Sequence, residues 1–365
     1  MLRRGGNSIR PSLLFVTQVI DPEDPALGFA IGWARALAER CERLAIIANE
    51  TRASVKGLEV HSLGKERGYG RAHRMAQYLA LVNRLGKELN WTGLLAHMCP
   101  DYVTAAAPIA HLRDIPLWLW FAHPSDTARL KLAQRLATGI LTSLPTSYPI
   151  DSPKTHVVGQ ATDLEALTLE PPLEPRRPLK LVVIGRSSPS KGFPTIIQAV
   201  ALAKSRGTDL RVRLIAPATT GEERSYHAEI KRLIDVHRLS DLTTLEDGLP
   251  PAEIPTVLRE SHALVNNGVS GTGDKVVFEA MASGRPVLVS NPSFRELLAG
   301  LRPLPLFPPD DAEVLSRRIE KLAATTIDQR ATIGAALRRR VAEGHSLDHW
   351  ADAVLSAMAS QQSRR

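Results

Sequence analysis

The stretch LEPPLEPRRPLKLVVIGR, residues 169–186, decides the fold because it separates two stretches of chain with the same pattern. Its four prolines lie within residues 169–178, which cannot continue a helix or a central strand and are therefore predicted to be a linker. The apolar run that starts at Leu179 then predicts a buried strand. One α/β pattern therefore ends at the linker, and a second begins directly after it.

Short apolar runs alternate with amphipathic segments on both sides of this linker. Buried strands that alternate with helices are typical of a parallel sheet covered on both faces. The fold class is therefore predicted to be α/β, with two doubly wound domains at residues 1–168 and 179–345 and an amphipathic helix at 346–365. The predicted strands are 12–20, 43–49, 93–98, 116–123, 139–144 and 155–159 before the linker, and 179–186, 210–217, 262–267 and 286–290 after it.

Length and composition support a two-domain globular protein. The chain has 365 residues and a mass of 39.8 kDa, which is too long for one ordinary domain. Hydrophobic residues make up 44% of it and charged residues 23%, so it can bury a full core. The two cysteines, Cys41 and Cys99, are far apart, which excludes a disulfide framework or a cysteine zinc site and favours a reducing compartment.

The net charge of +8 raises the question of nucleic-acid binding. Because 46 basic residues are offset by 38 acidic ones and aromatics make up only 5%, a platform for stacking bases is not expected. Anionic small molecules or an anionic membrane surface fit better. The basic segment 65–90 suits an amphipathic helix on such a membrane, or equally an ordinary surface helix, and both alternatives stay open.

The beginning of the chain resembles a signal peptide, with three arginines up to Arg10 before the apolar run 13–20. That run is short, contains Thr17 and Gln18, and leads into an acidic loop without a small-residue cleavage site, so it predicts a first buried strand. No segment approaches the roughly 18 apolar residues that a membrane span needs. We therefore expect a cytoplasmic protein, or one attached peripherally to the inner face of the plasma membrane.

The loop GRSSPSKG, residues 185–192, is the first candidate binding site. It follows an apolar strand and precedes a predicted helix, and such a loop offers free backbone amides and a helix N-terminus to an anion. Arg186 and Lys191 would add two positive charges that could hold a diphosphate. A plain connecting loop with two solvated cations remains the alternative.

The segment GVSGTGDKVVFEAMASG, residues 268–284, is the second candidate. It is not a Walker loop, and three of its glycines allow a ligand close to the backbone: Gly268, Gly271 and Gly273. Asp274 could cap the following helix, in which Glu279 lies among apolar residues. That carboxylate could accept hydrogen bonds from a ribose. The alternative is an i,i+4 ion pair between Lys275 and Glu279, but the apolar surroundings favour a functional Glu279.

The first half of the chain offers weaker candidates. Gly28 opens a helix after the loop that follows the first strand, where a backbone could approach a substrate. His97 and His123 both end apolar strands, and we favour His123 as the functional one. No Ser-His-Asp arrangement, no histidine-rich metal spacing and no GxGxxG after the first strand is found, so no metal site is predicted.

Together these segments resemble a retaining glycosyltransferase of family 4, in its bacterial branch, most strongly from Leu179 to Glu296. The resemblance implies the GT-B fold, with two Rossmann-like domains and a C-terminal helix that packs back on the first. It implies that Arg186 and Lys191 bind the diphosphate of a sugar nucleotide and that Glu279 holds the ribose. It also places His123 near the transferred sugar.

One departure from the family concerns the donor sugar. The family usually has a second glutamate eight residues before the first, and this chain has Gly271 at that position. The resemblance then leaves the contact with the donor sugar to the backbone of Gly271, Thr272, Gly273 and Asp274, or to Lys275.

The implied reaction moves a hexose from a nucleotide-diphosphate sugar to a hydroxyl acceptor with retention of configuration. The acceptor would be a lipid-linked or polysaccharide cell-envelope precursor. No cofactor is expected, and no metal is required in principle because the protein supplies positive charge to the leaving diphosphate. A nucleotide-sugar epimerase of the same fold, and a non-catalytic relative that only binds sugar nucleotides, are the alternatives.

Overall fold

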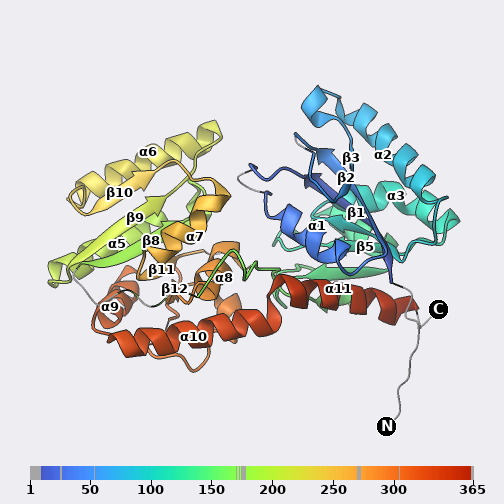
Figure 1. The fold of residues 1–365 in the computed structure, drawn as a ribbon. Coiled ribbons are helices and arrows are strands. Elements are labelled where there is room, and N and C mark those ends of the chain that lie inside the picture. The colour runs from blue at the N-terminus through green and yellow to red at the C-terminus, as the bar shows by residue number, and fades with distance from the viewer. Residues whose placement is uncertain are drawn as a thin grey trace, which may run out of the picture. The chain divides into compact units, whose positions relative to one another are not determined.

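The computed structural model describes residues 10–24, 27–52, 54–169, 171, 173, 178–268, 273–303 and 305–362. The chain forms two compact units (Figure 1). The first takes in the described residues up to Ser143, then Tyr148–Ala161 and the residues from Leu347 onward. The second comprises Leu144–Ser147 and Thr162–Ser346. The division falls between Ala161 and Thr162, so residues 162–168 are part of the second unit, and most of the predicted linker lies outside the described residues.

The first unit is built on a parallel sheet with the strand order β3-β2-β1-β4-β5-β6-β7. Its central strand β1 pairs with β2 on one side and β4 on the other, where Leu14 lies opposite Ala45 and Leu94. Nearly every residue of β1 is buried, as expected for a strand covered on both faces. The strands are β1 (Ser12–Val19), β2 (Arg43–Glu50), β3 (Glu59–Ser62), β4 (Gly93–His97), β5 (Leu117–Trp120), β6 (Gly139–Thr142) and β7 (Thr155–Val157).

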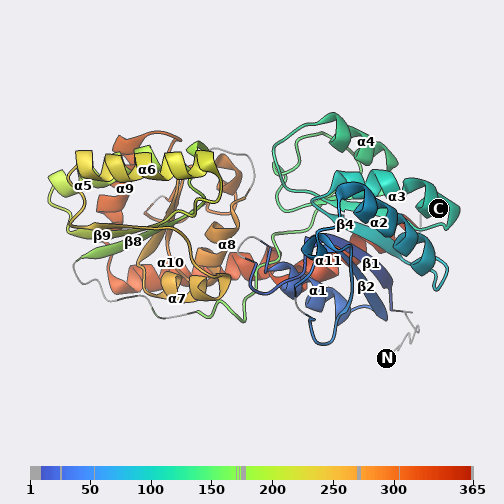
Figure 2. The same cartoon turned by 90° about the horizontal axis from the view of Figure 1, so that it is seen from above.

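Two sets of helices cover this sheet (Figure 2). Leu13 and Phe15 of β1 point to the face covered by α1 and α11, whereas Leu14 and Val16 point to the face covered by α2, α3 and α4. The helical segments are α1 (Ala30–Ala38), η1 (Lys65–Arg67), α2 (Arg71–Leu85), α3 (Pro100–Leu112), α4 (Ala128–Leu136) and α11 (Leu347–Gln362).

Helix α11 is part of the core of the first unit although it follows the whole second unit in sequence. Trp350 is fully buried, and its ring lies 4.5 Å from that of Trp33 in α1, centroid to centroid. At the edge of this contact, Arg40 donates to Asp348 and Asp352 at 2.7 and 2.6 Å. The apolar face of α11 therefore stabilises the first unit.

Helix α2 comes from the basic segment 65–90. Tyr78, Val82 and Leu85 are buried in the core of the first unit. Its apolar side is therefore occupied by the domain, and the ordinary surface-helix alternative describes it. No helix among the described residues is long and apolar enough to cross a membrane.

The second unit is built on a parallel sheet with the order β10-β9-β8-β11-β12. Helices α5, α6 and α9 pack on one face, and α7, α8 and α10 on the other. The strands are β8 (Leu179–Ile184), β9 (Leu210–Ile215), β10 (Thr243–Glu246), β11 (Ala263–Asn266) and β12 (Val287–Val289). The helical segments are η2 (Pro189–Lys191), α5 (Phe193–Ser205), α6 (Gly221–Val236), η3 (Pro251–Glu253), α7 (Ile254–Arg259), α8 (Lys275–Ala282), η4 (Pro292–Phe294), α9 (Ala312–Ala323) and α10 (Ile327–Gly344).

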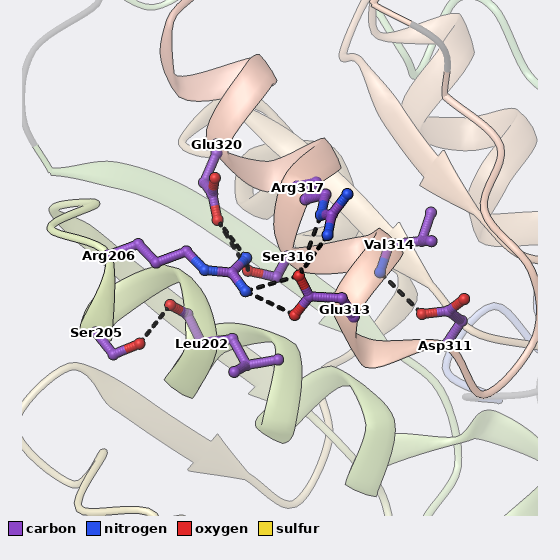
Figure 3. Close-up of polar contacts among 9 residues, drawn as sticks. All are labelled: Leu202, Ser205, Arg206, Asp311, Glu313, Val314, Ser316, Arg317 and Glu320. Atoms are coloured by element: carbon purple, nitrogen blue, oxygen red, sulfur yellow. Dashed lines mark hydrogen bonds and ion pairs between the residues drawn. The ribbon is translucent and has the colours of Figure 1, made fainter.

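Arg206, just after α5, connects this helix to α9 (Figure 3). Its guanidinium donates to Glu313 at 2.6 Å and to Glu320 at 3.0 Å. These partners raise the pKa of Arg206, the Glu313 hydrogen bond most of all. The cluster lies on the surface and joins the end of α5 to α9 by ion pairs.

Both sheets are parallel, and both have helices on the two faces, so the predicted α/β class with two Rossmann-like domains is confirmed. Thr162 and Ser346, the two ends of the long segment of the second unit, form a parallel bridge, and the Thr162 amide donates to the carbonyl oxygen of His345 at 2.6 Å. Two segments far apart in sequence are thereby joined within that unit.

Candidate functional site

The two predicted binding loops lie next to each other in the second unit. Strand β8 has β9 on one side and β11 on the other, and the helices that follow β8 and β11 pack on opposite faces of the sheet. This is the topological switch point, where the loops after the two strands diverge and leave room for a ligand. Residues 185–192 follow β8, and the segment from Asn267 follows β11.

Lys191 and Asp274 join these two loops. The Nζ of Lys191 lies 2.6 Å from Oδ1 of Asp274, and the other carboxylate oxygen accepts from Nδ2 of Asn266 at 2.8 Å. Both side chains of the pair are about four-fifths buried, at 20% and 16% exposed. The carboxylate is thus held by a cation and an amide. It accepts no hydrogen bond from the first-turn amides of α8, contrary to the capping role predicted for Asp274.

Gly192 brings the backbone close to the second loop. Its φ is +55°, and a Cβ placed there would lie 2.1 Å from Nδ2 of Asn267, which donates to the carbonyl oxygen of Gly192 at 3.1 Å. Both the conformation and the space therefore require glycine. The Oδ1 of Asn267 is buried and has no hydrogen-bond partner among the described residues, so a polar atom remains available at this point.

Arg186 turns toward a different element. Its Nη1 lies 3.5 Å from Oε1 of Glu223, and the side chain is 72% exposed. Glu223 also closes the capping box of α6, and hydrogen bonds from Thr219 and Thr220 lower its pKa, the Thr219 hydroxyl most of all. The structure therefore pairs Lys191 with Asp274 and Arg186 with Glu223, and the two predicted diphosphate ligands have separate partners.

Glu279 forms the ion pair that the sequence had left as an alternative. Its Oε1 is in direct contact with Nζ of Lys275 one helical turn earlier, and only 16% of its side chain is exposed. Gly273 lies at the start of this segment, where a Cβ would come within 2.8 Å of both Leu144 and Phe278. The predicted sites Gly271 and Thr272 lie outside the described residues.

The candidates of the first unit have different surroundings. His97 is buried among Phe29, Trp33 and Trp120, and its Nδ1 lies 3.0 Å from the Thr17 hydroxyl. Burial lowers the pKa of His97 to about 4, so the ring is neutral at pH 7. These contacts give His97 a place in the core.

His123 is exposed in the loop after β5, and its Nδ1 accepts a hydrogen bond from the amide of Ser125 at 3.1 Å. Gly28 lies in a tight turn, where a Cβ would come within 2.8 Å of the carbonyl oxygen of Asp24. Of the two strand-end histidines, His123 is the exposed one, and its role stays a prediction.

Sequence analysis did not predict a pocket of about 680 Å³ in the first unit. It lies where β1, β2, β4 and β5 end and where α2, α3 and α4 begin, and it is lined by Arg71, Arg74 and Arg129. No single motif encodes it, because each segment contributes only one or a few residues. Arg129 is far in sequence from Arg71 and Arg74, so no local signal pointed to the pocket.

Comparison with known proteins follows the same division of the chain. Residues 178–325 match the family model described as glycosyl transferases group 1, which is less than half of the chain. This matched region contains both loops of the switch point. WcaL of Escherichia coli (strain K12), provisionally named a colanic acid biosynthesis glycosyltransferase, is 24% identical over 195 residues, which are 52% of this chain and 47% of the relative. The chain therefore aligns with about half the length of this curated relative.

Solved structures match nearly the whole chain. Sucrose-phosphate synthase from Thermosynechococcus elongatus has a TM-score of 0.75 at 14% identity and covers 97% of this chain and 100% of that one. Anabaena Alr3699/HepE, solved in complex with UDP and glucose, has a TM-score of 0.74 at 16% identity over 96% and 100%. These likenesses show the GT-B fold. With the group 1 match, they support a GT-B glycosyltransferase.

Proposed function

We propose that this chain is a retaining glycosyltransferase of family 4 that transfers a hexose from a nucleotide-diphosphate sugar to a hydroxyl group. The observation that carries the proposal is the contact between Lys191 and Asp274 at the switch point of the second unit, inside the region that matches the group 1 model. It places a lysine where doubly wound domains bind phosphates. Alr3699/HepE, which shares the fold, was solved with UDP and glucose.

The chemical demand of the reaction is the negative charge that grows on the leaving diphosphate. Lys191 meets it by exchanging Asp274 for the phosphates, and the N-terminus of α5, which no side chain caps, adds its amides. Arg186 is exposed, and it gives up only its 3.5 Å contact with Glu223 when it binds the diphosphate. The protein supplies this charge, so the proposal includes no metal.

The transfer breaks the bond between the anomeric carbon and the diphosphate oxygen and forms one from that carbon to the acceptor oxygen. With the acceptor on the same face as the leaving group, the configuration is retained. The acceptor's proton passes to the departing diphosphate oxygen, so atoms and charges balance without a protein nucleophile. His123, exposed on the first unit, is assigned to the sugar.

Glu279 is proposed to hold the ribose of the donor. It is largely buried and paired with Lys275, so the ribose hydroxyls replace one cationic partner. In this proposal Lys275 and the backbone of the segment from Gly271 to Asp274 contact the donor sugar. The acceptor is proposed to be a glycan or lipid-linked envelope precursor at the cytoplasmic side, supported by the name of WcaL. Membrane contact by α2 is no part of this proposal.

The experiment is a thermal-shift series with UDP, GDP and ADP on the wild type, Glu279→Ala and, as a control, Glu229→Ala on the outer face of α6. A ligand at about 100 times its Kd should stabilise the fold by about 2.7 kcal/mol. We expect one nucleotide to stabilise the wild type and the control equally and Glu279→Ala less. A folded wild type that responds to none of the three would overturn the proposal. Binding without transfer to any acceptor would favour the non-catalytic alternative.

A further inference from the structure

The pocket of the first unit has the position of a ligand site. It opens at the carboxyl ends of β1 and β4, which form the switch point of that sheet just as β8 and β11 do in the second unit. Its volume of about 680 Å³ exceeds what an inorganic ion fills and suits a small organic molecule. All of its described lining residues belong to the first unit.

The charge of the pocket is positive. Arg71, Arg74 and Arg129 line it, and Asp101 is the one acidic residue among the described lining residues. The carboxylate of Asp101 is shared, at 2.9 Å from Arg71 and 3.6 Å from Arg129. Three guanidinium groups therefore face a single carboxylate, which leaves most of their donors free for a ligand.

Arg74 is the best placed of the three. Its Nη1 donates to the neutral Oδ1 of Asn49 at 2.8 Å, and no ion pair with a carboxylate is found for it among the described residues. Its Nε is buried without a hydrogen-bond partner in the described part of the chain. An unpaired guanidinium donor away from water is costly, so a ligand that accepts from Arg74 would relieve this cost.

Two helices add to the positive potential. Helix α2 begins at Arg71 and α3 at Pro100, and neither N-cap residue makes a side-chain hydrogen bond to the first turn. Both first turns lie at the pocket, so their amides and dipoles favour an anion beside the arginines. The pocket also has apolar lining residues, among them Met75, Met98 and Phe121.

We propose that this pocket binds an amphiphilic anion, in which a phosphate or carboxylate group contacts Arg71, Arg74 and Arg129 and an apolar or ring-bearing part contacts Met75, Met98 and Phe121. Arginine suits such groups because its planar donors match two oxygens at once. Resting on the proposed function, this molecule is the sugar acceptor, and the arginines select acceptors that carry a negative charge near the reacting hydroxyl.

The test is calorimetric titration of the whole chain, without nucleotide, with octyl phosphate below its micelle concentration. Octyl glucoside provides the same apolar chain without the charge, and inorganic phosphate provides the charge without the chain. We expect octyl phosphate to bind most tightly and to weaken as salt rises. Octyl glucoside binding as tightly as octyl phosphate, or no binding of octyl phosphate, would contradict the proposal.

Variants locate the binding within the pocket. Arg71→Ala with Arg129→Ala changes two exposed side chains, and Arg74→Ala removes the partly buried one; each is expected to weaken octyl phosphate binding about tenfold or more. Arg74→Lys should recover part of the loss, because it restores charge without the planar donors. Arg84→Ala is the matched control, an exposed arginine of α2 outside the pocket lining. Equal binding by all variants would overturn the proposal.

The same preparations separate this inference from the proposed function. Nucleotide binding belongs to the second unit, and octyl phosphate binding to the first. If octyl phosphate binds through the arginines but no nucleotide binds, the pocket stands and the donor assignment fails. If a nucleotide binds but octyl phosphate does not, the donor assignment stands and the anionic acceptor is wrong.

Discussion

The carboxyl ends of the two sheets have the same topology and different chemistry. In the first unit, the ends of β1 and β4 carry neutral groups: Thr17 contacts His97, and Gln18 contacts Cys99. In the second, the corresponding loops carry the ion pair of Lys191 and Asp274. The first edge has a positively charged pocket. At the second edge, the charge of Lys191 is neutralised by Asp274. In the first unit, one partly exposed carboxylate, Asp101, is shared by two of three arginines. In the second, a largely buried carboxylate is paired with the lysine, so a ligand has to compete with it more directly.

The largest effect is expected where the first unit depends on α11. Trp350→Ala removes a fully buried ring and should lower the free energy of unfolding by about 3–5 kcal/mol. The loss should be confined to the first unit, and urea unfolding by circular dichroism with limited proteolysis would locate it. Ser356→Ala, on the exposed side of α11, serves as the control. Equal destabilisation of both units would contradict the prediction that only the first unit depends on α11.

The ion pair between Lys191 and Asp274 can be removed by substituting either residue. Lys191→Ala should weaken the proposed binding of a nucleoside diphosphate by about tenfold to a hundredfold, because it removes a charge-assisted hydrogen bond. Asp274→Asn should strengthen it, since the competing negative charge is lost. Both are measured by calorimetric titration.

Lys204→Ala is the matched control for this pair, because that lysine pairs with Asp241 at the far end of α5. Binding that falls in Asp274→Asn as much as in Lys191→Ala would show that the carboxylate does not compete with the phosphates.

The free energy of unfolding should depend on pH because of His97, the neutral histidine at the carboxyl end of β4. The pKa of His97 is about 4 in the folded protein, below its usual value of about 6.5, so the unfolded chain binds more protons between these pH values. Stability should therefore fall as pH falls, by about 2 kcal/mol between pH 7.5 and pH 5 from this group. Urea unfolding of the wild type and His97→Gln at both values measures it. The same pH dependence in both proteins would exclude His97 as its source.

The smallest effect is expected at the surface cluster of the second unit. Arg206→Ala breaks the contacts with Glu313 and Glu320, but Arg206 is exposed and the two glutamates are only half-buried, so the free energy of unfolding should fall only slightly. This loss should shrink further in high salt. Thermal unfolding at low and high ionic strength tests this, and a large loss that salt does not change would point to packing by the side chain.

The sequence predicted the central strands of both sheets and two of the four edge strands, β7 and β12. Runs such as 12–20 and 179–186 became β1 and β8 because strands buried on both faces must be continuously apolar. The strands missed were β3 and β10, with sequences EVHS and TTLE. Both lie at an edge of their sheet and are largely half-exposed, so no apolar run marks them.

The candidate site was predicted in its position but not in its pairing. Lys191 and Asp274 were both found from loops that follow apolar strands, yet their contact depends on which strands are neighbours, and strand order has no local signal. The same reason explains Arg186, whose partner Glu223 begins a helix in another part of the domain. The pocket of the first unit was missed because its arginines come from two separate helices, α2 and α4, and only the fold brings them together.

The position of Trp350 also bears on how the protein is made. A domain synthesised first can normally fold on the ribosome before the next one emerges. Here the core of the first unit includes α11, which is translated only after the whole second unit. The first unit must therefore wait with the surface that receives Trp350, beside Trp33 of α1, uncovered. The second domain is expected to be the first to reach its finished fold.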